Sequence, residues 1–405
     1  MTYNVIQGNS AEVLKQYPDN YFDSVVCDPP YGINFLGKDW DSNTGEEEVY
    51  RQCYRVLKPG GHLLAFSAAR TYHHLAMSVE RSGFEIRDQI MWVYGSGFPK
   101  SQDVGRQIQK SLGVKETKRI KTHDLRSNAL MDGKGQAELD QVIATDPEAK
   151  RWSGWGNALK PSHEPIVVAQ KPMKQALYKN VQEWGVGALN IDACRVGDSE
   201  SIGRFPANLI HDGSQEVVEL FPDSNGAGGS IPDTKVSGYG EFSGRGKSTY
   251  TPNNRTPVDS GSGSAARFFY CAKVSRGERN IGCEDVEPTY KEAANFRPNH
   301  MEKAQNGEDG NPFGRYKPIQ NNHPTVKPVD LMRYLIKLVT PSNSRVLDPF
   351  CGSGSTGMAA VELGHEFVGI ELDPRYCDIA RRRIQGWIDQ LDPITRSPLF
   401  GERNV

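Results

Sequence analysis

A glycine-rich segment close to the end of the chain is the feature that most constrains the fold. A strand is predicted over residues 345–347 (Arg-Val-Leu), and residues 348–356 follow it as Asp-Pro-Phe-Cys-Gly-Ser-Gly-Ser-Thr. Glycines let the backbone approach a ligand closely, and the helix predicted over residues 355–363 offers unpaired N–H groups in its first turn. The next strand, residues 367–370, ends at Glu371, where a carboxylate can accept both hydroxyls of a ribose. We therefore predict a site for an adenosine-containing cofactor.

The spacing of the glycines does not identify that cofactor. Gly352, Gly354 and Gly357 satisfy the pattern G-x-G-x-x-G. Glu371 follows at close to the spacing of about 20 residues that dinucleotide sites show. A nicotinamide cofactor and S-adenosylmethionine both fit this pattern, so the glycines leave the choice open.

The place of this segment in the chain predicts the fold class. After Glu371 only one helix, predicted over residues 375–391, and a tail remain, so a doubly wound sheet cannot be completed downstream. The missing strands must come from the N-terminal part. Apolar runs there end at Ile6, Cys27, Phe66 and near Val93. We expect an α/β fold with a circularly permuted, Rossmann-like sheet that binds ligands at the carboxyl ends of its strands.

Further elements follow from apolar spacing and from glycine and proline. Helices are predicted over residues 11–17, 47–57, 69–81 and 328–339, and strands over residues 24–27, 62–66, 84–94 and 164–169. Pro59-Gly60-Gly61 is expected to end the second of these helices. Residues 32–48 form a polar loop with an isolated Trp40, which we interpret as a mobile flap beside the site.

A second motif, Asp28-Pro29-Pro30-Tyr31, follows the predicted strand at residues 24–27. Proline lacks an N–H and fixes φ, so the strand must end at Asp28. The Asp28 carboxylate and the proline carbonyls can accept hydrogen bonds, and Tyr31 offers a ring for stacking. An exocyclic amine on a nucleobase would satisfy all of these groups. For this motif alone, an ordinary strand end with a helix-capping aspartate is an equally good interpretation.

Composition narrows the class of protein. The chain has 405 residues and a formal net charge of −2. It contains no run of about 18 apolar residues and no signal-peptide pattern at its N-terminus, which predicts a cytoplasmic protein outside the membrane. The seven cysteines form no CxxC pair, so we expect free thiols and no metal site. A nucleic-acid partner needs a local basic surface, and residues 106–126 are the candidate.

The two motifs, in this order, resemble those of the DNA amino-methyltransferases that act on adenine N6 or cytosine N4, in their permuted β-class arrangement. Asp28-Pro29-Pro30-Tyr31 is similar to the catalytic motif, and residues 348–356 are similar to the cofactor motif. Residues 323–328 (His-Pro-Thr-Val-Lys-Pro) resemble the segment that precedes the cofactor motif, and Gly8-Asn9-Ser10 the segment beside the cofactor's adenine. Phage, prophage and restriction-modification methylases resemble this chain, and two further segments match phage and prophage enzymes: residues 158–165 and 265–270.

The resemblance implies a division of the chain. Residues 1–95 would be the catalytic half of the methyltransferase domain, residues 156–172 its return strand, and residues 323–405 its cofactor-binding half. Residues 96–155 would be a basic insertion that contacts DNA. Residues 173–322, which show little regular periodicity, would be a large and irregular target-recognition region. Arg195, Arg204 and Arg267 are candidate base readers there, although an ordinary structural role is the simpler interpretation.

The resemblance also implies S-adenosylmethionine as cofactor and a set of site residues. The catalytic residues would be Asp28, Pro29, Pro30 and Tyr31. The cofactor would contact Asn9, Ser10, Asp28, Thr325, Lys327, Asp348, Phe350, Gly352, Gly354, Ser355, Thr356, Glu371 and Asp373. Within this set, Asn9 and Ser10 would lie near the adenine, and Thr325 and Lys327 near the methionine end. Helix capping for Asn9 and Ser10, capping and surface roles for Thr325 and Lys327, and packing for Phe350 are the alternatives.

The expected reaction is methyl transfer from S-adenosylmethionine to N6 of an adenine flipped out of duplex DNA. Tyr31 would stack on the base, while Asp28 and the Pro29 carbonyl accept its amino hydrogens. An aspartate at the first motif position favours adenine, because many cytosine N4 enzymes carry serine there. Cytosine N4 methylation, a nicotinamide-dependent oxidoreductase and a catalytically silent DNA-binding relative are the alternatives. A homodimer and a cognate restriction enzyme are further expectations.

Overall fold

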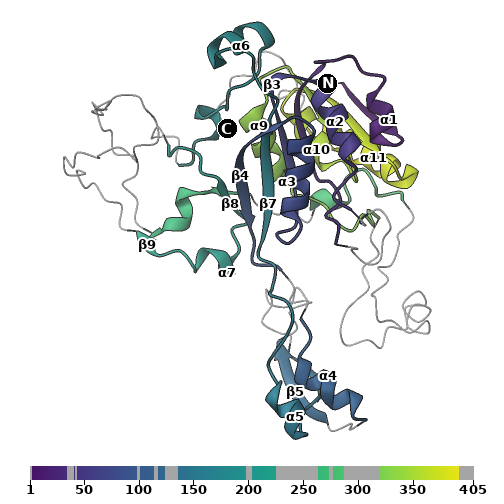
Figure 1. The fold of residues 1–405 in the computed structure, drawn as a ribbon, viewed down its shortest axis with the longest axis vertical. Coiled ribbons are helices and arrows are strands. Elements are labelled where there is room, and N and C mark those ends of the chain that lie inside the picture. Colours follow the sequence, from purple (N-terminus) through teal and green to yellow (C-terminus); the bar gives the residue numbers. More distant parts are fainter. Residues whose placement is uncertain are drawn as a thin grey trace, which may run out of the picture.

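A computed structural model describes residues 2–33, 41, 43–97, 101–113, 117–123, 136–197, 203–224, 263–272, 277–286 and 320–391. Within these residues, a sheet is covered by helices on both faces, and a small unit projects away from it (Figure 1). No helix among them has the length and apolar composition that crossing a membrane requires. Six cysteines, Cys27, Cys53, Cys194, Cys283, Cys351 and Cys377, are buried thiols without a disulfide.

The described strands of the main sheet follow the order β1-β13-β12-β2-β3-β7-β4-β8-β11. Their bounds are β1 (Tyr3–Gln7), β2 (Phe22–Cys27), β3 (Leu57–Phe66), β4 (Glu85–Val93), β7 (His163–Gln170), β8 (Leu209–His211), β11 (Tyr270–Cys271), β12 (Arg345–Asp348) and β13 (Glu366–Glu371). Neighbours are parallel except at β7, which runs antiparallel to β3 and β4. The C-terminal strands β12 and β13 therefore lie between β1 and β2, and the predicted permutation of the sheet is confirmed.

The sheet is buried on both faces, which is why its central strands read as continuous apolar runs. Every residue of β2 is buried. Its successive side chains alternate between two apolar clusters: Val26 joins one and Val25 the other. The helices α1 (Ser10–Leu14), α2 (Glu47–Val56) and α3 (Tyr72–Arg81) contribute to the cluster around Val25. On the other face lie α9 (Val329–Val339), α10 (Ser355–Glu362) and α11 (Pro374–Gln390).

The predicted helix over residues 47–57 is confirmed, but the predicted start of the next strand at residue 62 was wrong. Helix α2 ends at Val56, before Pro59-Gly60-Gly61, and β3 begins at once with Leu57 and runs through these residues. Hydrogen bonds with Lys171 hold this stretch: Gly60 N donates to Lys171 O, and Lys171 N donates to Gly61 O, each at 2.9 Å. Sheet pairing therefore overrides the local tendency of proline and glycine to form a turn. Helices α1 and α3 are also shorter than predicted, ending at Leu14 and beginning at Tyr72.

The projecting part is here called the satellite unit and comprises the described residues between 101 and 157. It contains α4 (Val104–Ser111), the antiparallel pair β5 (Thr117–His123) and β6 (Gln136–Val142), and α5 (Pro147–Arg151). The buried Gln109 side chain ties it together, because its Oε1 accepts from Thr145 N at 2.8 Å and Asp146 N at 3.0 Å. The chain leaves the sheet after β4 and returns at β7, and Tyr94 N donates to Ser162 O at 2.9 Å between the two connections.

The satellite unit includes part of the predicted basic surface. Arg106 and Lys110 lie on α4. The side chains of Lys115, Lys118, Arg119, Lys121 and Arg126 lie outside the described residues. No regular element was predicted for this insertion, whereas the structure has short helices and a two-stranded sheet.

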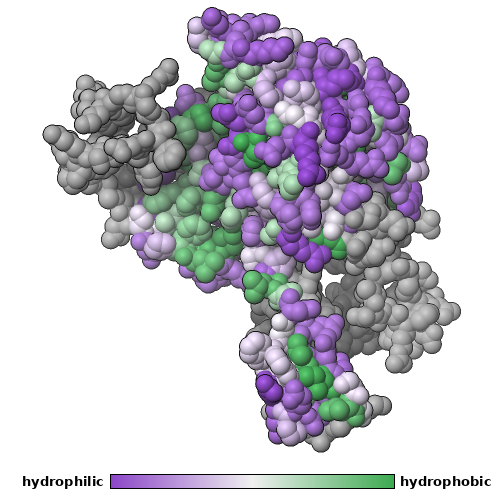
Figure 2. Space-filling view, in the orientation of Figure 1, coloured by the Kyte–Doolittle hydropathy of each residue, from purple (hydrophilic) through white to green (hydrophobic). Residues whose placement is uncertain are grey.

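The region after β7 is more regular than predicted at its contact with the main sheet. Strands β8 and β11 extend the sheet beyond β4. Around them are α6 (Leu177–Trp184), η4 (Asp192–Cys194), α7 (Gln215–Val218), β9 (Asp223–Ser224), β10 (Gly263–Ser264), η5 (Ala265–Phe268) and η6 (Gly277–Arg279). Residues 225–262 lie outside the described part. Figure 2 shows a hydrophobic area over α7 and β8, and this region carries the exposed side chains of Phe205 and Leu220.

The arginines named as candidate base readers make contacts within the protein. Arg195 pairs with Asp192 at 2.8 Å, and the Arg204 guanidinium lies 3.6 Å from the centroid of the Phe268 ring. Arg267 donates hydrogen bonds to the carbonyl oxygens of residues 263 and 264. These contacts agree with the structural role that was the simpler interpretation.

Candidate active site

The cavity at the carboxyl edge of the sheet gathers most of the predicted site residues. Strands β1, β2, β3, β12 and β13 all end at this edge, and the antiparallel β7 begins there. The cavity has a volume of about 1640 Å³. Its lining includes Asn9, Ser10, Asp28, Pro29, Pro30, Tyr31, Thr325, Lys327, Asp348, Phe350, Gly352, Ser355, Thr356, Glu371 and Asp373. Gly354 is the one predicted site residue absent from that lining.

Asp348, the last residue of β12, holds the two ends of the glycine loop. Its Oδ1 accepts from Phe350 N at 3.0 Å, and its Oδ2 accepts from Thr356 Oγ1 at 2.5 Å. The side chain is buried, and this burial raises the pKa of Asp348 to about 7. Asp348 therefore shapes the loop that a cofactor would contact.

Glu371, the last residue of β13, is oriented by backbone groups. Its Oε2 accepts from Gly352 N at 2.8 Å, and its Oε1 accepts from Asp373 N at 2.9 Å. Burial raises the pKa of this carboxyl group above its usual value. Each oxygen keeps a further lone pair, so the fixed carboxylate can still accept from two neighbouring hydroxyl groups.

The two glycines of the loop have different surroundings. Gly352 has a φ of +52°, and a Cβ there would lie 2.9 Å from His323 Nε2. Gly354 has a φ of +84°, and its Cβ would lie 3.1 Å from the Cα and Cβ of Ala380 on α11. Gly352 thus belongs to the cavity wall, whereas Gly354 serves the close packing of α10 against α11. Gly354 does not line the cavity, and its predicted contact with the cofactor stays a prediction.

Asn9 and Ser10 line the cavity and also make local contacts. Asn9 Oδ1 caps α1 by accepting from Ala11 N at 2.9 Å, so the capping interpretation of this residue is confirmed. Ser10 Oγ donates to Pro349 O at 2.5 Å and thereby links α1 to the glycine loop. Phe350 likewise lines the cavity and also packs on Tyr50, with ring centroids 6.1 Å apart.

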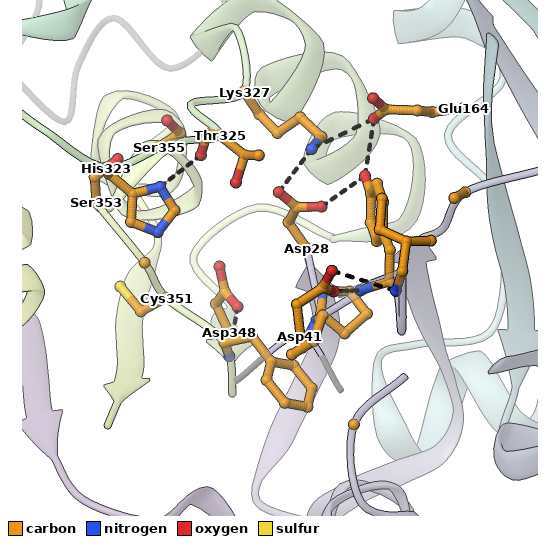
Figure 3. A pocket seen from close by; sticks show the side chains of 18 of the residues that line it. Asp28, Asp41, Glu164, His323, Thr325, Lys327, Asp348, Cys351, Ser353 and Ser355 are labelled. Carbon is orange, nitrogen blue, oxygen red and sulfur yellow. Dashed lines mark hydrogen bonds and ion pairs between the residues drawn. The ribbon is translucent and has the colours of Figure 1, made fainter. Parts of the chain in front are cut away.

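Asp28, directly after β2, is at the centre of a buried hydrogen-bonded cluster (Figure 3). Lys327 Nζ lies 2.6 Å from Asp28 Oδ2 and 3.4 Å from Glu164 Oε2. The Tyr31 hydroxyl lies 2.9 Å from Asp28 Oδ1 and 2.8 Å from Glu164 Oε2. These four residues are here called the Asp28 cluster. The side chain of Lys327 is directed at the catalytic motif, not only at a cofactor as the sequence suggested.

The electrostatics of the Asp28 cluster keep its groups in defined protonation states. Burial, reinforced by the charges of Asp28 and Glu164, raises the pKa of Tyr31 well above its usual range, so its hydroxyl remains protonated. Burial acts to lower the pKa of Lys327, but the two carboxylates outweigh this effect and the net shift is upward. The cluster therefore has two carboxylates, one ammonium group and one neutral phenol.

Asp41 fixes the backbone that follows the motif, although the sequence placed it in a mobile flap. Its Oδ1 accepts from Tyr31 N at 2.6 Å and Gly32 N at 3.0 Å, and its Oδ2 accepts from Ile33 N at 3.2 Å. The side chain is buried. Residues 34–40, with Trp40, and residue 42 lie outside the described part, so the flap itself stays a prediction.

Sequence reasoning missed Asp41, Glu164 and His323 as site residues. His323 Nδ1 lies 2.7 Å from Thr325 O, and burial lowers the pKa of His323 to about 4, so the ring is neutral at physiological pH. Residues 158–165 had been singled out as a motif, but no role was given to Glu164. The direction of β7 was the missing information, since only an antiparallel strand places its first residues at this edge.

Comparisons with known proteins agree on one family. A family model described as DNA methylase matches residues 22–382. Type II methyltransferase M2.DpnII of Streptococcus pneumoniae is 44% identical over 63 residues, which are 16% of this chain and 24% of that protein. Type II methyltransferase M.BglII of Bacillus subtilis is 24% identical over 95% of this chain and 70% of its own length. The chain spans about a quarter of the length of M2.DpnII and of the M2.MboI enzyme of Moraxella bovis.

Solved structures of DNA methyltransferases resemble the chain more distantly. The structure of M1.HpyAVI in complex with SAM aligns with 95% of this chain and 99% of the M1.HpyAVI chain. The sequence identity is 16% and the TM-score is 0.39. The cytosine-N4-specific PvuII DNA methyltransferase aligns with 97% of this chain and 88% of the PvuII enzyme chain. The sequence identity is 13% and the TM-score is 0.43.

Proposed function

This chain belongs to the N6/N4 DNA methylase family, and from this premise we propose that it transfers a methyl group from S-adenosylmethionine to N6 of an adenine flipped out of duplex DNA. The observation that carries the choice of adenine is the Asp28 carboxylate at the first motif position, in the same cavity as the glycine loop. An ionised carboxylate only accepts hydrogen bonds, so it suits an amino group as its partner. The preference for adenine over cytosine rests on the resemblance, because many cytosine N4 enzymes carry serine at this motif position. Family membership removes the nicotinamide-dependent oxidoreductase from consideration.

The cavity has the chemistry that S-adenosylmethionine requires, and methyl transfer in this family depends on that cofactor. Glu371 would accept the ribose hydroxyls, Gly352 would allow close approach of the backbone, and Asn9 and Ser10 would border the adenine. The Asp28 cluster has two carboxylates against one ammonium group. Its net negative charge complements the positive charge that the amino nitrogen of the base gains during methyl transfer. When bound, the cofactor supplies an electrophilic methyl carbon.

The residues of the Asp28 cluster would orient the base and receive its protons. Asp28 and the Pro29 carbonyl accept the amino hydrogens, which draws the nitrogen lone pair out of conjugation with the ring. Tyr31 presents its ring to the base, and Asp41 fixes the Tyr31 backbone by the hydrogen bond to its N–H at 2.6 Å. The methylated nitrogen must then lose a proton, for which Asp28 is the adjacent acceptor. These residues would therefore act by orienting the base and by electrostatic stabilisation, without a covalent intermediate.

We place the DNA over the mouth of this cavity. The segment from 157 to 163, which leads from the satellite unit into β7, lines the cavity. Within it, Leu159 is 91% exposed, and Trp155 just before it is 62% exposed. The satellite unit would contact the DNA backbone and residues 173–322 would read the sequence, as the resemblance implies. A duplex substrate, a homodimer and a cognate restriction enzyme belong to the same proposal.

The test is expression of the protein in a host without DNA methylation, followed by mass spectrometry of the digested host DNA. We expect N6-methyladenine with the wild type and none with a folded Asp28→Ala variant. N4-methylcytosine instead would retain the site and overturn the choice of base. An absence of both, with folded protein that binds S-adenosylmethionine in calorimetry, would identify a catalytically silent relative.

A further inference from the structure

Glu164 is a half-buried carboxylate that the proposed reaction does not yet use. It comes from the start of β7, opposite Trp92 of β4, far in sequence from Asp28 and from Lys327. Its side chain is 19% exposed and contacts both the Tyr31 hydroxyl and the Lys327 ammonium group. Placing a second carboxylate beside Asp28 is unfavourable unless it has a function or a compensating partner. Among the described residues, Lys327 is the ion-pair partner of both carboxylates.

The hydrogen bonds of Tyr31 indicate what that function is. The hydroxyl has a single proton but two acceptors at nearly equal distance, Asp28 Oδ1 at 2.9 Å and Glu164 Oε2 at 2.8 Å. It can therefore bond to only one carboxylate at a time. While it bonds to Asp28, it occupies one of the two lone pairs of Oδ1, and Oδ2 receives the Lys327 ammonium group at 2.6 Å. While it bonds to Glu164, both lone pairs of Asp28 Oδ1 are available to another donor.

We propose that Glu164 is a positioning residue, which takes over the Tyr31 hydroxyl and shares the Lys327 ammonium group when the target base enters the cavity. This transfer of one hydrogen bond leaves Asp28 Oδ1 free for the amino group of the base. The inference rests on the proposed function, since it assigns Asp28 to that amino group. In this role Glu164 acts through Tyr31 and Lys327 and not on the reacting atoms.

The geometry explains why an uncharged acceptor in place of Glu164 would leave Asp28 less able to bind the amino group of the base. Without a carboxylate at this position, the Tyr31 hydroxyl keeps Asp28 as its charged partner, and the incoming amino group must compete for the same oxygen. Lys327 would also lose one of its two carboxylates and bind Asp28 more closely. Hydrogen bonds to charged groups are stronger than neutral ones, so both effects reduce the ability of Asp28 to accept from the base.

The charged and titratable neighbours of Lys327 give the proposal a pH signature. Around its ammonium group are Asp28, Glu164, the Tyr31 hydroxyl and the neutral His323 ring, while Tyr94 lies against Glu164. Burial opposes the charge of Lys327, and the two carboxylates overcome it. In Glu164→Gln one of these carboxylates is gone, so the pKa of Lys327 should fall. Its activity should therefore decline at a lower alkaline pH than that of the wild type.

The experiment combines Glu164→Gln with Tyr31→Phe in a double-mutant cycle of methyl transfer. Loss of one charged hydrogen bond predicts a decrease of about 10- to 100-fold in kcat for Glu164→Gln. KM for DNA and the Kd of S-adenosylmethionine should stay within about threefold. In the Tyr31→Phe background, the same change should cost much less, because the hydroxyl that Glu164 receives is absent. Glu85→Gln is the matched control: it lies at the opposite end of the β4–β7 pair and forms an exposed ion pair with Arg87.

A second readout is independent of methyl transfer. Once the recognition site is known from sequencing of methylated host DNA, 2-aminopurine at the target position reports flipping by its fluorescence. We expect Glu164→Gln to lower the fluorescence increase, and Glu164→Asp, whose shorter side chain cannot reach Tyr31 equally well, to restore it only in part. The proposal would be overturned if the decreases in kcat for Glu164→Gln and Tyr31→Phe were additive in the double variant and the activity of Glu164→Gln declined at the same alkaline pH as that of the wild type. A kcat of Glu164→Gln within about twofold of wild type would also overturn it. Failure of the proposed function itself would differ, because the wild type would then also lack methyl transfer.

Discussion

The two halves of the cavity are built in different ways. In the cofactor half, residues 348–373 form one continuous stretch of chain, and its carboxylates bind backbone N–H groups of that same stretch. Asp348 accepts from Phe350 N, and Glu371 accepts from Gly352 N and Asp373 N. In the transfer half, Asp28, Glu164 and Lys327 come from three separate segments and contact one another through side chains.

The difference predicts how each half responds to mutation. A contact between a side chain and the local backbone is set as soon as the loop folds, so the cofactor half is preorganised by its own sequence. A side-chain cluster has alternative pairings, and its geometry depends on all members being present. Changes in the cofactor half should therefore weaken ligand binding, whereas changes in the transfer half should slow the reaction.

The largest effect is expected for Asp28→Asn. The amide keeps one acceptor oxygen but presents an NH2 group, a hydrogen-bond donor, to Lys327 or to the amino group of the base. We expect methyl transfer to fall by about 10³-fold, the size of effect seen when a group that acts in the transition state is removed. The measurement is the incorporation of a labelled methyl group into DNA. Asp19→Asn, which alters an exposed ion pair with Arg55, should leave the rate unchanged; equal losses would contradict the assignment.

Lys327→Met should be the most destabilising change in the transfer half. It leaves Asp28 and Glu164 buried side by side, and breaking a buried ion pair typically costs about 3–5 kcal/mol. Urea unfolding measures this loss. The pKa of Lys327 is raised in the folded state, so the stability from its charge is present below its unfolded pKa of about 10.4 and is lost only above it. The difference in the free energy of unfolding between wild type and variant should therefore be the same at about pH 8 as at about pH 9. A loss below about 1 kcal/mol would show that the pair contributes little.

Glu371→Gln tests the cofactor half. The glutamine has one acceptor oxygen for two backbone N–H groups and presents an NH2 group to one of them. We expect the affinity for S-adenosylmethionine to fall by about 10-fold or more, equivalent to about 1.4 kcal/mol. Isothermal titration calorimetry provides the measurement. Glu366→Gln, on the same strand and in an exposed ion pair with Arg345, should bind as wild type does. Unchanged binding in Glu371→Gln would remove Glu371 from the cofactor site.

The smallest effect concerns Gly354, the glycine of the loop that does not line the cavity. Gly354→Ala should lower stability by about 1–2 kcal/mol through its positive φ, and by somewhat more through contact with Ala380. Gly364→Ala is a close control, because its φ is +80° and no atom lies within 4 Å of the added Cβ. Thermal unfolding should place Gly354→Ala below Gly364→Ala, with cofactor affinity unchanged in both. A loss of cofactor affinity in Gly354→Ala, but not in Gly364→Ala, would support the cofactor contact of Gly354 that the sequence predicts.

The same difference between the halves explains what could be predicted from sequence. The glycine loop and Glu371 were found because the loop, the strand and the acidic residue are contiguous. The circular permutation of the sheet followed from the small number of elements after Glu371. The motif Asp28-Pro29-Pro30-Tyr31 was found because two prolines after a strand are rare. These signals are local, and local signals survive in a single sequence.

The pairing of distant side chains left no comparable signal. Glu164 is ordinary in sequence, and its position depends on β7 running antiparallel between β3 and β4. Lys327 was assigned to the cofactor's methionine end, whereas its ammonium group lies 2.6 Å from Asp28. Asp41 was placed in a polar loop, and only the fold brings it to the N–H of Tyr31.

Titration of S-adenosylmethionine into the wild type and Asp28→Asn tests the division of the cavity most directly. If the cofactor half is preorganised by its own segment, the inactive variant should bind the cofactor with a Kd within about threefold of the wild type. If binding is lost together with methyl transfer while the variant remains folded, the two halves are not separate, and Asp28 contributes to cofactor binding more than to the reaction.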